Sequence, residues 1–132
     1  MAVNRLAGDP PSPYETAYGF SRVVRAGQFV LIGGTTSVGP GGSVIGETPA
    51  EQTSEILRRI EHELSRAESA LADVVQIRVY VTDISRADEV GRVFGEAFGS
   101  IRPLMTMVEV AALIDPRMLV EIEAIAVPGS GT

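Results

Sequence analysis

The segment from Leu119 to Val127 constrains the fold more than any other part of the chain. Its even-numbered positions from 120 to 126 are all apolar, which predicts a β-strand face that packs under helices. Glu121 and Glu123 lie on the opposite face, beside apolar residues such as Ile125. Because burial of an unpaired carboxylate is costly, we expect these acids to meet partner groups or to line a cavity.

Four further strand patterns and two helical patterns precede this segment. Strands are predicted over residues 18–24, 28–33, 73–82, 105–111 and 119–127. Helices are predicted over residues 50–70 and 86–98, where apolar residues recur at three- and four-residue spacing. The resulting order, β-β-α-β-α-β-β, favours an α+β fold with a single sheet and two helices on one face.

The chain is long enough for one domain, which is predicted to span residues 1–132. Gly8 and three prolines between positions 10 and 13 predict a flexible arm over residues 1–13, and residues 128–132 are expected to form a flexible tail. The Ala26-Gly27 pair predicts a tight turn between the first two strands. Residues 39–42 are glycine-rich but lack the lysine and the spacing of a phosphate-binding loop, so they predict a turn.

Composition argues against several classes of function. A net charge of −6 and a pI near 4.7 disfavour binding to nucleic acid. The chain has no cysteine, which removes disulfides, thiol nucleophiles and cysteine metal sites, and no metal site is expected. The single histidine, His62, lies among charged residues of a predicted helix and is expected at the surface. No secretory signal or membrane span is recognised, so a cytoplasmic protein without a membrane partner is expected.

The sheet face away from the helices combines apolar and charged residues. Arg78 and Tyr80 of one strand lie on it with Glu121 and Glu123 of another. This face is too apolar to be fully solvated and too charged for a sealed core. It therefore predicts a subunit interface with clefts, in which apolar groups pack between copies and charged groups pair or line a pocket.

Four segments together resemble the reactive-intermediate deaminase family, RidA, also called YjgF. The segments are RAGQFVLIGGT at 25–35, EQT at 51–53 with its helix, DVVQIRVYVTD at 73–83, and VEVA at 108–111 through VEIEAIA at 120–126. The resemblance covers roughly residues 18–127. It implies a chorismate mutase-like fold, a homotrimer with a central barrel, and clefts between neighbouring subunits that take a small molecule.

The resemblance also implies an activity. Active members of the family hydrolyse 2-imino acids to 2-keto acids and ammonia without a metal or organic cofactor. In them an arginine of a Pro-x-Arg motif holds the substrate carboxylate, and a glutamate of the last strand activates water. Glu121 matches that glutamate, and its alternative role is an interfacial ion pair. Met105 of Pro103-Leu104-Met105 occupies the arginine position, and methionine cannot pair with a carboxylate.

Other positions follow from the same match. The aromatic residue that closes the cleft aligns near Phe20, with Tyr14 and Tyr18 as alternatives, and Gly33-Gly34 matches a Ser-Gly pair. Arg102, Arg78 and Arg22 are candidates to replace the lost arginine. Glu123 is expected to pair with an arginine across the trimer, and Glu109 is divided between a cleft role and a structural one. The predicted substrate-binding residues are Phe20, Gly34, Met105, Met107 (through its backbone amide), Arg102 and Glu109.

Two functions follow from these residues. The first is an enzyme that acts on a small imine, enamine or carbonyl compound, with Glu121 as acid/base and weak activity on simple 2-imino acids. Its reaction is hydrolytic deamination, or a proton transfer or cyclisation that needs no carboxylate clamp. The alternative is a non-catalytic trimer that binds a small molecule or a partner, which the loss of arginine at Met105 favours. A ribonuclease is disfavoured by the acidic charge and the absence of a basic aromatic patch.

Overall fold

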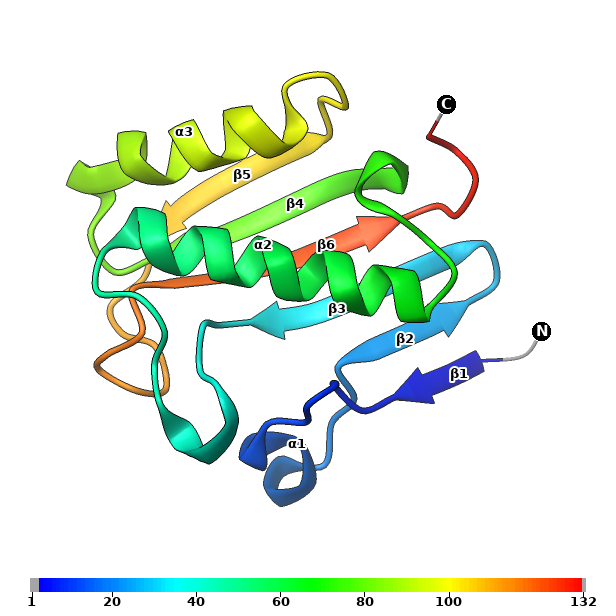
Figure 1. The fold of residues 1–132 in the computed structure, drawn as a ribbon, viewed down its shortest axis with the longest axis horizontal. Helices are drawn as coiled ribbons and strands as arrows, with labels where there is room; N and C mark the ends of the chain where they lie inside the picture. The colour runs from blue at the N-terminus through cyan, green and yellow to red at the C-terminus, as the bar shows by residue number, and fades with distance from the viewer. Residues whose placement is uncertain (1–2, 132) are drawn as a thin grey trace.

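The computed structural model describes residues 3–131, which form one six-stranded sheet covered by helices (Figure 1). The strands are β1 (Val3–Leu6), β2 (Val23–Ala26), β3 (Phe29–Thr35), β4 (Val74–Val81), β5 (Leu104–Glu109) and β6 (Val120–Ala126). The α-helices are α1 (Pro13–Tyr18), α2 (Pro49–Arg66) and α3 (Ala87–Phe98), with short 3-10 turns at Pro40–Gly42, Leu71–Asp73 and Ile84–Arg86. The strand order is β1-β2-β3-β6-β4-β5. Only the β4–β5 pair is parallel among these neighbours.

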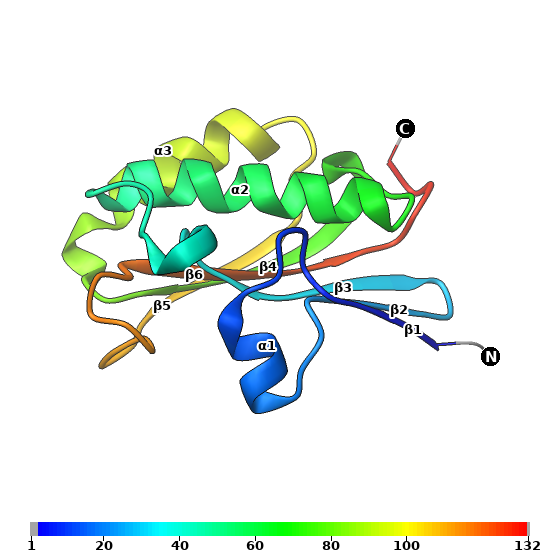
Figure 2. The same cartoon turned by 60° about the horizontal axis from the view of Figure 1, so that its bottom comes forward.

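Helices α2 and α3 lie side by side on one face of the sheet, whereas α1 lies beyond the other face (Figure 2). Helix α2 begins with a capping box in which the Thr48 hydroxyl accepts a hydrogen bond from the Glu51 amide at 3.1 Å. Its apolar stripe, which includes Ile56, Ile60 and Leu64, is fully buried against the sheet. The predicted single sheet with two helices on one face is therefore confirmed, with α1 as an addition.

Strand β6 lies in the middle of the sheet, between β3 and β4. Its even-numbered residues from 120 to 126 are buried under the helices, while Glu121, Glu123 and Ile125 are half-buried on the opposite side. We call this opposite side of the sheet the outer face. The alternation predicted for the last strand is thus confirmed, and it places both glutamates on the outer face.

The N-terminal region differs from its prediction. Within the expected flexible arm of residues 1–13, Val3–Leu6 forms β1 and pairs with β2, and α1 begins at Pro13. The strand expected to begin at Tyr18 begins at Val23, because α1 ends at Tyr18 and Gly19 adopts a left-handed conformation with φ 77°. The turn after β2 is Gly27-Gln28, since Ala26 already pairs with Phe29.

The C-terminal residues form hydrogen bonds with the rest of the chain. The Gly131 amide donates a hydrogen bond to Asp73 Oδ1 at 2.9 Å, and the Ser130 amide donates to the Val127 carbonyl at 3.0 Å. The flexibility expected of residues 128–132 stays a prediction. Residues 1–2 and 132, which the same predictions included, lie outside the described part of the chain. Within the described residues, no helix is both long and apolar enough to cross a membrane.

Candidate functional site

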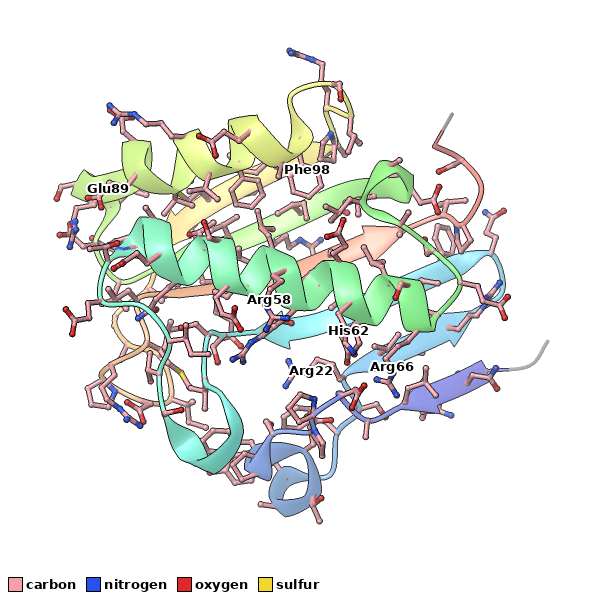
Figure 3. All side chains as sticks on the ribbon, viewed as in Figure 1. Arg22, Arg58, His62, Arg66, Glu89 and Phe98 are labelled. Carbon is pink, nitrogen blue, oxygen red and sulfur yellow. The ribbon has the colours of Figure 1, made fainter. Side chains whose placement is uncertain are left out.

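A cavity of about 510 Å³ lies where the N-terminal segment, α2 and the end of β3 meet. Residues 8–12 and α1 line one side, and α2 lines the side facing them. The wall contributed by β3 and β6 includes Gly34 and Glu121. In Figure 3, Arg58 and His62 extend from the side of α2 that faces Arg22, and all three residues line this cavity.

Glu121 contributes a half-buried carboxylate to the cavity wall. Its position on the outer face of a central strand removes much of its hydration, and this burial raises the pKa of Glu121 above its ordinary value. The nearby Arg22 guanidinium opposes the rise, and the Glu123 carboxylate adds to it. A carboxyl group with a raised pKa in a cavity is suited to both accept and return a proton.

Gly34 makes room for this carboxylate. A Cβ atom at position 34 would overlap the Oε2 atom of Glu121, whereas a Cβ at Gly33 would lie 3.4 Å from the Arg22 carbonyl oxygen, a tight but feasible contact. The Glu121 carboxylate therefore packs directly against the β3 backbone. A side chain at Gly34 would require that carboxylate to move.

Arg22 is the cation adjacent to Glu121, and it is fixed by other groups. It donates a hydrogen bond to the Gly34 carbonyl oxygen, and it lies 3.6 Å from the Glu15 carboxylate. Glu15 in turn accepts hydrogen bonds from the amides of Gly8 at 2.8 Å and Ser12 at 2.6 Å. Burial alone would raise the pKa of Glu15, but these amides and Arg22 outweigh it and leave the pKa below its usual value. This network ties residues 8–12 to the cavity.

The α2 side of the cavity contains a second set of ion pairs. Glu55 binds Arg58 and Arg59, each at 2.7 Å, and hydrogen bonds from Arg58 contribute most to lowering the pKa of Glu55 to about 2. Arg59 also donates to the Thr36 carbonyl oxygen at 3.0 Å, so it secures the chain after β3. His62 Nε2 lies 3.0 Å from Asp9 Oδ2, which joins α2 to the N-terminal segment.

Aromatic side chains line the α1 side of the cavity. The Tyr14 and Tyr18 rings stack with their centroids 5.7 Å apart, and Tyr18 is 65% exposed. Phe20 is 44% exposed, and the Arg22 guanidinium lies 5.9 Å from its ring centroid. The apolar residues Ile45 and Ile114 also line the cavity, and both are exposed.

Comparison with known proteins agrees with this fold. The Endoribonuclease L-PSP family model matches residues 11–128. The crystal structure of Rv2704 from Mycobacterium tuberculosis, described as a member of the YjgF/YER057c/UK114 family, superposes with a TM-score of 0.86. It is 49% identical, and the match covers 96% of this chain and 99% of that chain. The chain belongs to the YjgF family, also called RidA or Endoribonuclease L-PSP.

Two curated relatives support the same assignment. The uncharacterized protein SCO2049 of Streptomyces coelicolor is 35% identical over 120 residues, which cover 90% of this chain and 89% of that protein. The 3-aminoacrylate deaminase RutC of Acinetobacter baylyi is 30% identical over 123 residues, which cover 90% of this chain and 91% of that protein. The family resemblance predicted from the four sequence segments is confirmed.

The YjgF fold brings some of the predicted site residues together. Glu121, Phe20 and Gly34 all line the cavity, as does Arg22, one of the three candidate replacement arginines. The aromatic alternatives Tyr14 and Tyr18 line it as well, so all three residues remain candidates for the aromatic residue that closes the cleft. His62 is exposed as expected, although it also lies on the cavity wall.

The β5 residues lie elsewhere in the same chain. Met105 pairs with Ile77 and Met107 with Val79, which places both methionines on the helix-covered side of the sheet. Met105 is 44% exposed because β5 is an edge strand, and Met107 packs against the core. Neither residue belongs to the cavity wall of its own chain.

Arg102 and Glu109 lie at the two ends of the β5 region. Arg102 follows α3 with a φ of 58°, and its amide donates to the Phe98 carbonyl oxygen at 2.8 Å. Glu109 accepts a hydrogen bond from the Ile84 amide at 3.0 Å, which agrees with its structural alternative. Both side chains are exposed and lie outside the cavity of their own chain.

Glu123 is paired with groups of its own chain. It accepts a hydrogen bond from the Tyr80 hydroxyl at 2.7 Å and lies 3.5 Å from Arg78. The expected arginine partner is therefore present, but it comes from the neighbouring strand β4. Glu123 thus has an arginine partner within its own chain, and its pairing across a trimer stays a prediction.

Sequence reasoning missed the contribution of α2 and of residues 8–12. Arg58 and Arg59 are absent from the predicted site residues, although their spacing from Glu55 predicts the observed ion pairs. Their position on the cavity depends on how the N-terminal segment folds against α2, which no local pattern shows. Among residues 3–131, no cluster of three or more histidine or acidic side chains could hold a metal ion.

Proposed function

We propose that this YjgF-family protein is an enzyme that acts on a small imine, enamine or carbonyl compound in the cavity beside Glu121. The observation that carries the proposal is the Glu121 carboxyl group, whose pKa is raised by burial at the wall of a cavity of about 510 Å³. The cavity size is in the range that small-molecule sites occupy.

The direct reaction is hydrolysis of a carbon–nitrogen double bond. Glu121, in its ionised form, accepts a proton from water while the water oxygen forms a bond to the imine carbon. Glu121 passes that proton to the nitrogen, which gives a carbinolamine. Glu121 then accepts the carbinolamine hydroxyl proton as the carbonyl forms, and it transfers this proton to the nitrogen as the carbon–nitrogen bond breaks. One imine and one water thereby give one carbonyl compound and one ammonia. The proton-transfer or cyclisation variant uses the same carboxyl group as acid and base.

A named relative supports this reaction class. The Acinetobacter baylyi protein, 30% identical to this chain, is a 3-aminoacrylate deaminase. This chain has Met105 on an exposed edge strand at the position where the family resemblance implies an arginine clamp. We therefore expect weak activity on simple 2-imino acids, since loss of a charge-assisted contact costs on the order of 2–5 kcal/mol.

We also propose that three copies associate through the outer face. Two apolar side chains on this face, Phe29 and Leu31, are exposed to 42% and 37%. Strand β5 presents further exposed apolar residues at Leu104 and Val108. Association would cover these residues and would bring β5 of one copy near the cavity of the next. Sedimentation equilibrium should give three times the chain mass of 14.0 kDa, and a monomer would exclude this arrangement.

The test of the enzyme is Glu121→Gln. Ammonia release would be measured above the uncatalysed rate for 2-iminopropanoate and for the neutral imine of acetophenone, both formed in situ. Glu121→Gln should lower turnover of an accepted imine by roughly 100- to 10,000-fold, the usual contribution of a general acid or base. Glu61→Gln, a change on the exposed side of α2, is the control for the loss of one charge. Unchanged turnover in Glu121→Gln would contradict the mechanism.

A non-catalytic binding protein is the second candidate. The observation that favours it is the methionine at position 105 of β5, where the family resemblance implies an arginine that holds the substrate carboxylate. It predicts that ligands bind in the cavity without turnover and that Glu121→Gln leaves binding unchanged. Turnover of either imine that depends on Glu121 would exclude this candidate.

A further inference from the structure

Each basic side chain that lines the cavity already has a carboxylate partner in the same chain. Arg22 faces Glu15 at 3.6 Å, and His62 faces Asp9 at 3.0 Å. Arg58 and Arg59 share Glu55, each at 2.7 Å. Within the described part of the chain, these four are the only basic residues on the cavity wall. A carboxylate ligand would therefore have to compete with a carboxylate of the protein for any of them.

Three of these pairs are also tied to the surrounding chain. The Glu15 carboxylate receives the amides of Gly8 and Ser12, and Arg59 donates to backbone carbonyls after β3. The Asp9 amide donates to Glu63 at 3.3 Å beside the His62 pair. Breaking such a pair would disturb the N-terminal segment or the end of β3. The protein carboxylates are therefore the preferred partners of these basic side chains.

The Glu121 carboxylate further disfavours binding of an anionic ligand. Glu121 and Glu123 lie on the same face of β6, and Glu121 is half-buried. An anionic ligand beside Glu121 would bring like charges together in a site with little water, where screening is weak. A neutral ligand carries no charge and avoids this repulsion.

Aromatic and aliphatic side chains give part of the cavity wall an apolar surface. Tyr14 and Tyr18 stack at 5.7 Å between ring centroids, and Tyr18 and Phe20 are 65% and 44% exposed. Exposed aromatic groups gathered on the wall of one cavity form a surface on which another ring can stack. Ile45 and Ile114, 45% and 55% exposed, extend the apolar wall.

We propose that the ligand of this cavity is a neutral molecule with an aromatic ring, which stacks on Tyr14, Tyr18 and Phe20 and directs a carbonyl or imine group toward Glu121. The proposal rests on the proposed function for the position of the reacting group at Glu121. It concerns binding, however, and binding can be measured without turnover. The proposal also distinguishes this cavity from sites that recognise their ligand by its carboxylate.

The experiment compares benzamide with benzoate, which share a ring and differ in charge. Both would be titrated into the full ¹⁵N-labelled protein at pH 7.5, with the amide signals of Gly8 and Gly34 as reporters of the cavity. Benzamide should bind about tenfold more tightly than benzoate, which corresponds to the cost of placing a charge near Glu121 without a free cation of the same chain. Equal binding, or tighter binding of benzoate, would overturn the proposal.

A charge variant tests the role of the ion pairs. Glu55→Gln removes the carboxylate that Arg58 and Arg59 share, and it should strengthen benzoate binding by about fivefold or more while benzamide binding stays the same. Glu61→Gln removes the same charge from the exposed side of the same helix and should change neither ligand. If Glu55→Gln affects benzoate binding no more than Glu61→Gln does, the result would exclude the idea that Glu55 weakens anion binding by neutralising Arg58 and Arg59.

An aromatic variant tests the stacking surface. Tyr18→Ala removes an exposed ring at the end of α1 and should weaken benzamide binding by about three- to tenfold, in line with the usual worth of an aromatic pair. Ile84→Ala, which removes an exposed apolar side chain outside the cavity, should have no effect. If Tyr18→Ala leaves benzamide binding unchanged, the proposed stacking of the ligand ring on Tyr18 is wrong.

The experiments distinguish failure of the neutral-ligand proposal from failure of the proposed enzyme. Selective benzamide binding with no turnover of either imine would refute the enzyme and retain the neutral-ligand proposal. Turnover of 2-iminopropanoate that depends on Glu121, with equal binding of benzamide and benzoate, would retain the enzyme and refute the neutral ligand.

Discussion

Glu121 and Glu123 lie two residues apart on the same face of β6, yet their surroundings differ. Glu123 receives the Tyr80 hydroxyl at 2.7 Å and faces Arg78 at 3.5 Å. Glu121 instead packs against the Gly34 backbone at the wall of the large cavity, and burial raises its pKa. The same residue type on the same strand is therefore a structural partner at one position and a candidate acid/base at the other.

The difference comes from the neighbouring strands. Glu123 lies opposite Arg78 of β4, in the well-paired centre of the sheet. Glu121 lies near the end of β3, where the β3–β6 register shifts between Ile32 and Thr35 and two glycines replace side chains. The register shift and the two glycines leave space for a carboxylate beside the cavity. The regular part of the sheet leaves no such space.

The largest effect that tests this contrast is expected from Gly34→Ala. Its new Cβ would overlap Glu121 Oε2 and displace the carboxylate from the cavity wall. If the proposed acid/base role holds, turnover of an accepted imine should fall by about 100-fold, since catalytic groups need close positioning. Steady-state kinetics would measure it, with circular dichroism to verify the fold.

Gly33→Ala is the matched control. Its Cβ would meet the Arg22 carbonyl oxygen at 3.4 Å, and neither glycine has a positive φ. Turnover should therefore stay within about threefold of the parent protein. If both variants lose turnover equally, the loss reflects disturbance of β3 and the special position of Glu121 is not supported.

A smaller effect is expected from Glu123→Gln. The amide oxygen can still accept from Tyr80, but the ion pair with the half-exposed Arg78 is lost. The free energy of unfolding should fall by about 0.2–1 kcal/mol, the range for an exposed pair. Urea unfolding would measure it, and turnover should stay close to the parent value. A large loss of turnover would show that both glutamates act in the site.

The overall fold followed from local patterns, because alternation in β4 and β6 and helical spacing in α2 are strong signals. The placement of Glu121 on the outer face also followed, since a strand has only two faces. Strand β1 and helix α1 did not follow. Residues 3–6 form a strand only by pairing with β2, and the prolines near position 10 predict irregular chain.

The site was only partly predictable for a related reason. Phe20, Gly34 and Glu121 were found through family resemblance. His62 and Asp9, however, meet at the cavity although they are 53 positions apart in the sequence. Met105 and Glu109 were expected in the cleft because of their family positions. Their register with β4 places them on the helix-covered side of their own chain.

The smallest expected effect is on stability, and it depends on pH. Because the folded-state pKa of Glu121 is raised above the ordinary value of 4.5, folding favours the protonated form. The parent protein keeps this contribution below the unfolded-state pKa and loses it as the pH rises through the folded-state pKa. Glutamine resembles the protonated acid at every pH, so Glu121→Gln should not lose stability in this range.

Thermal unfolding at pH 4 and pH 8 would measure this difference. Glu121→Gln should match the parent at pH 4 and exceed its Tm at pH 8, by on the order of 2 °C for a domain of this size. Glu123→Gln, which removes an ion pair, should instead lower the Tm at pH 8. If both variants change the Tm in the same direction at pH 8, the two carboxylates share one kind of environment, and burial does not distinguish Glu121 from Glu123.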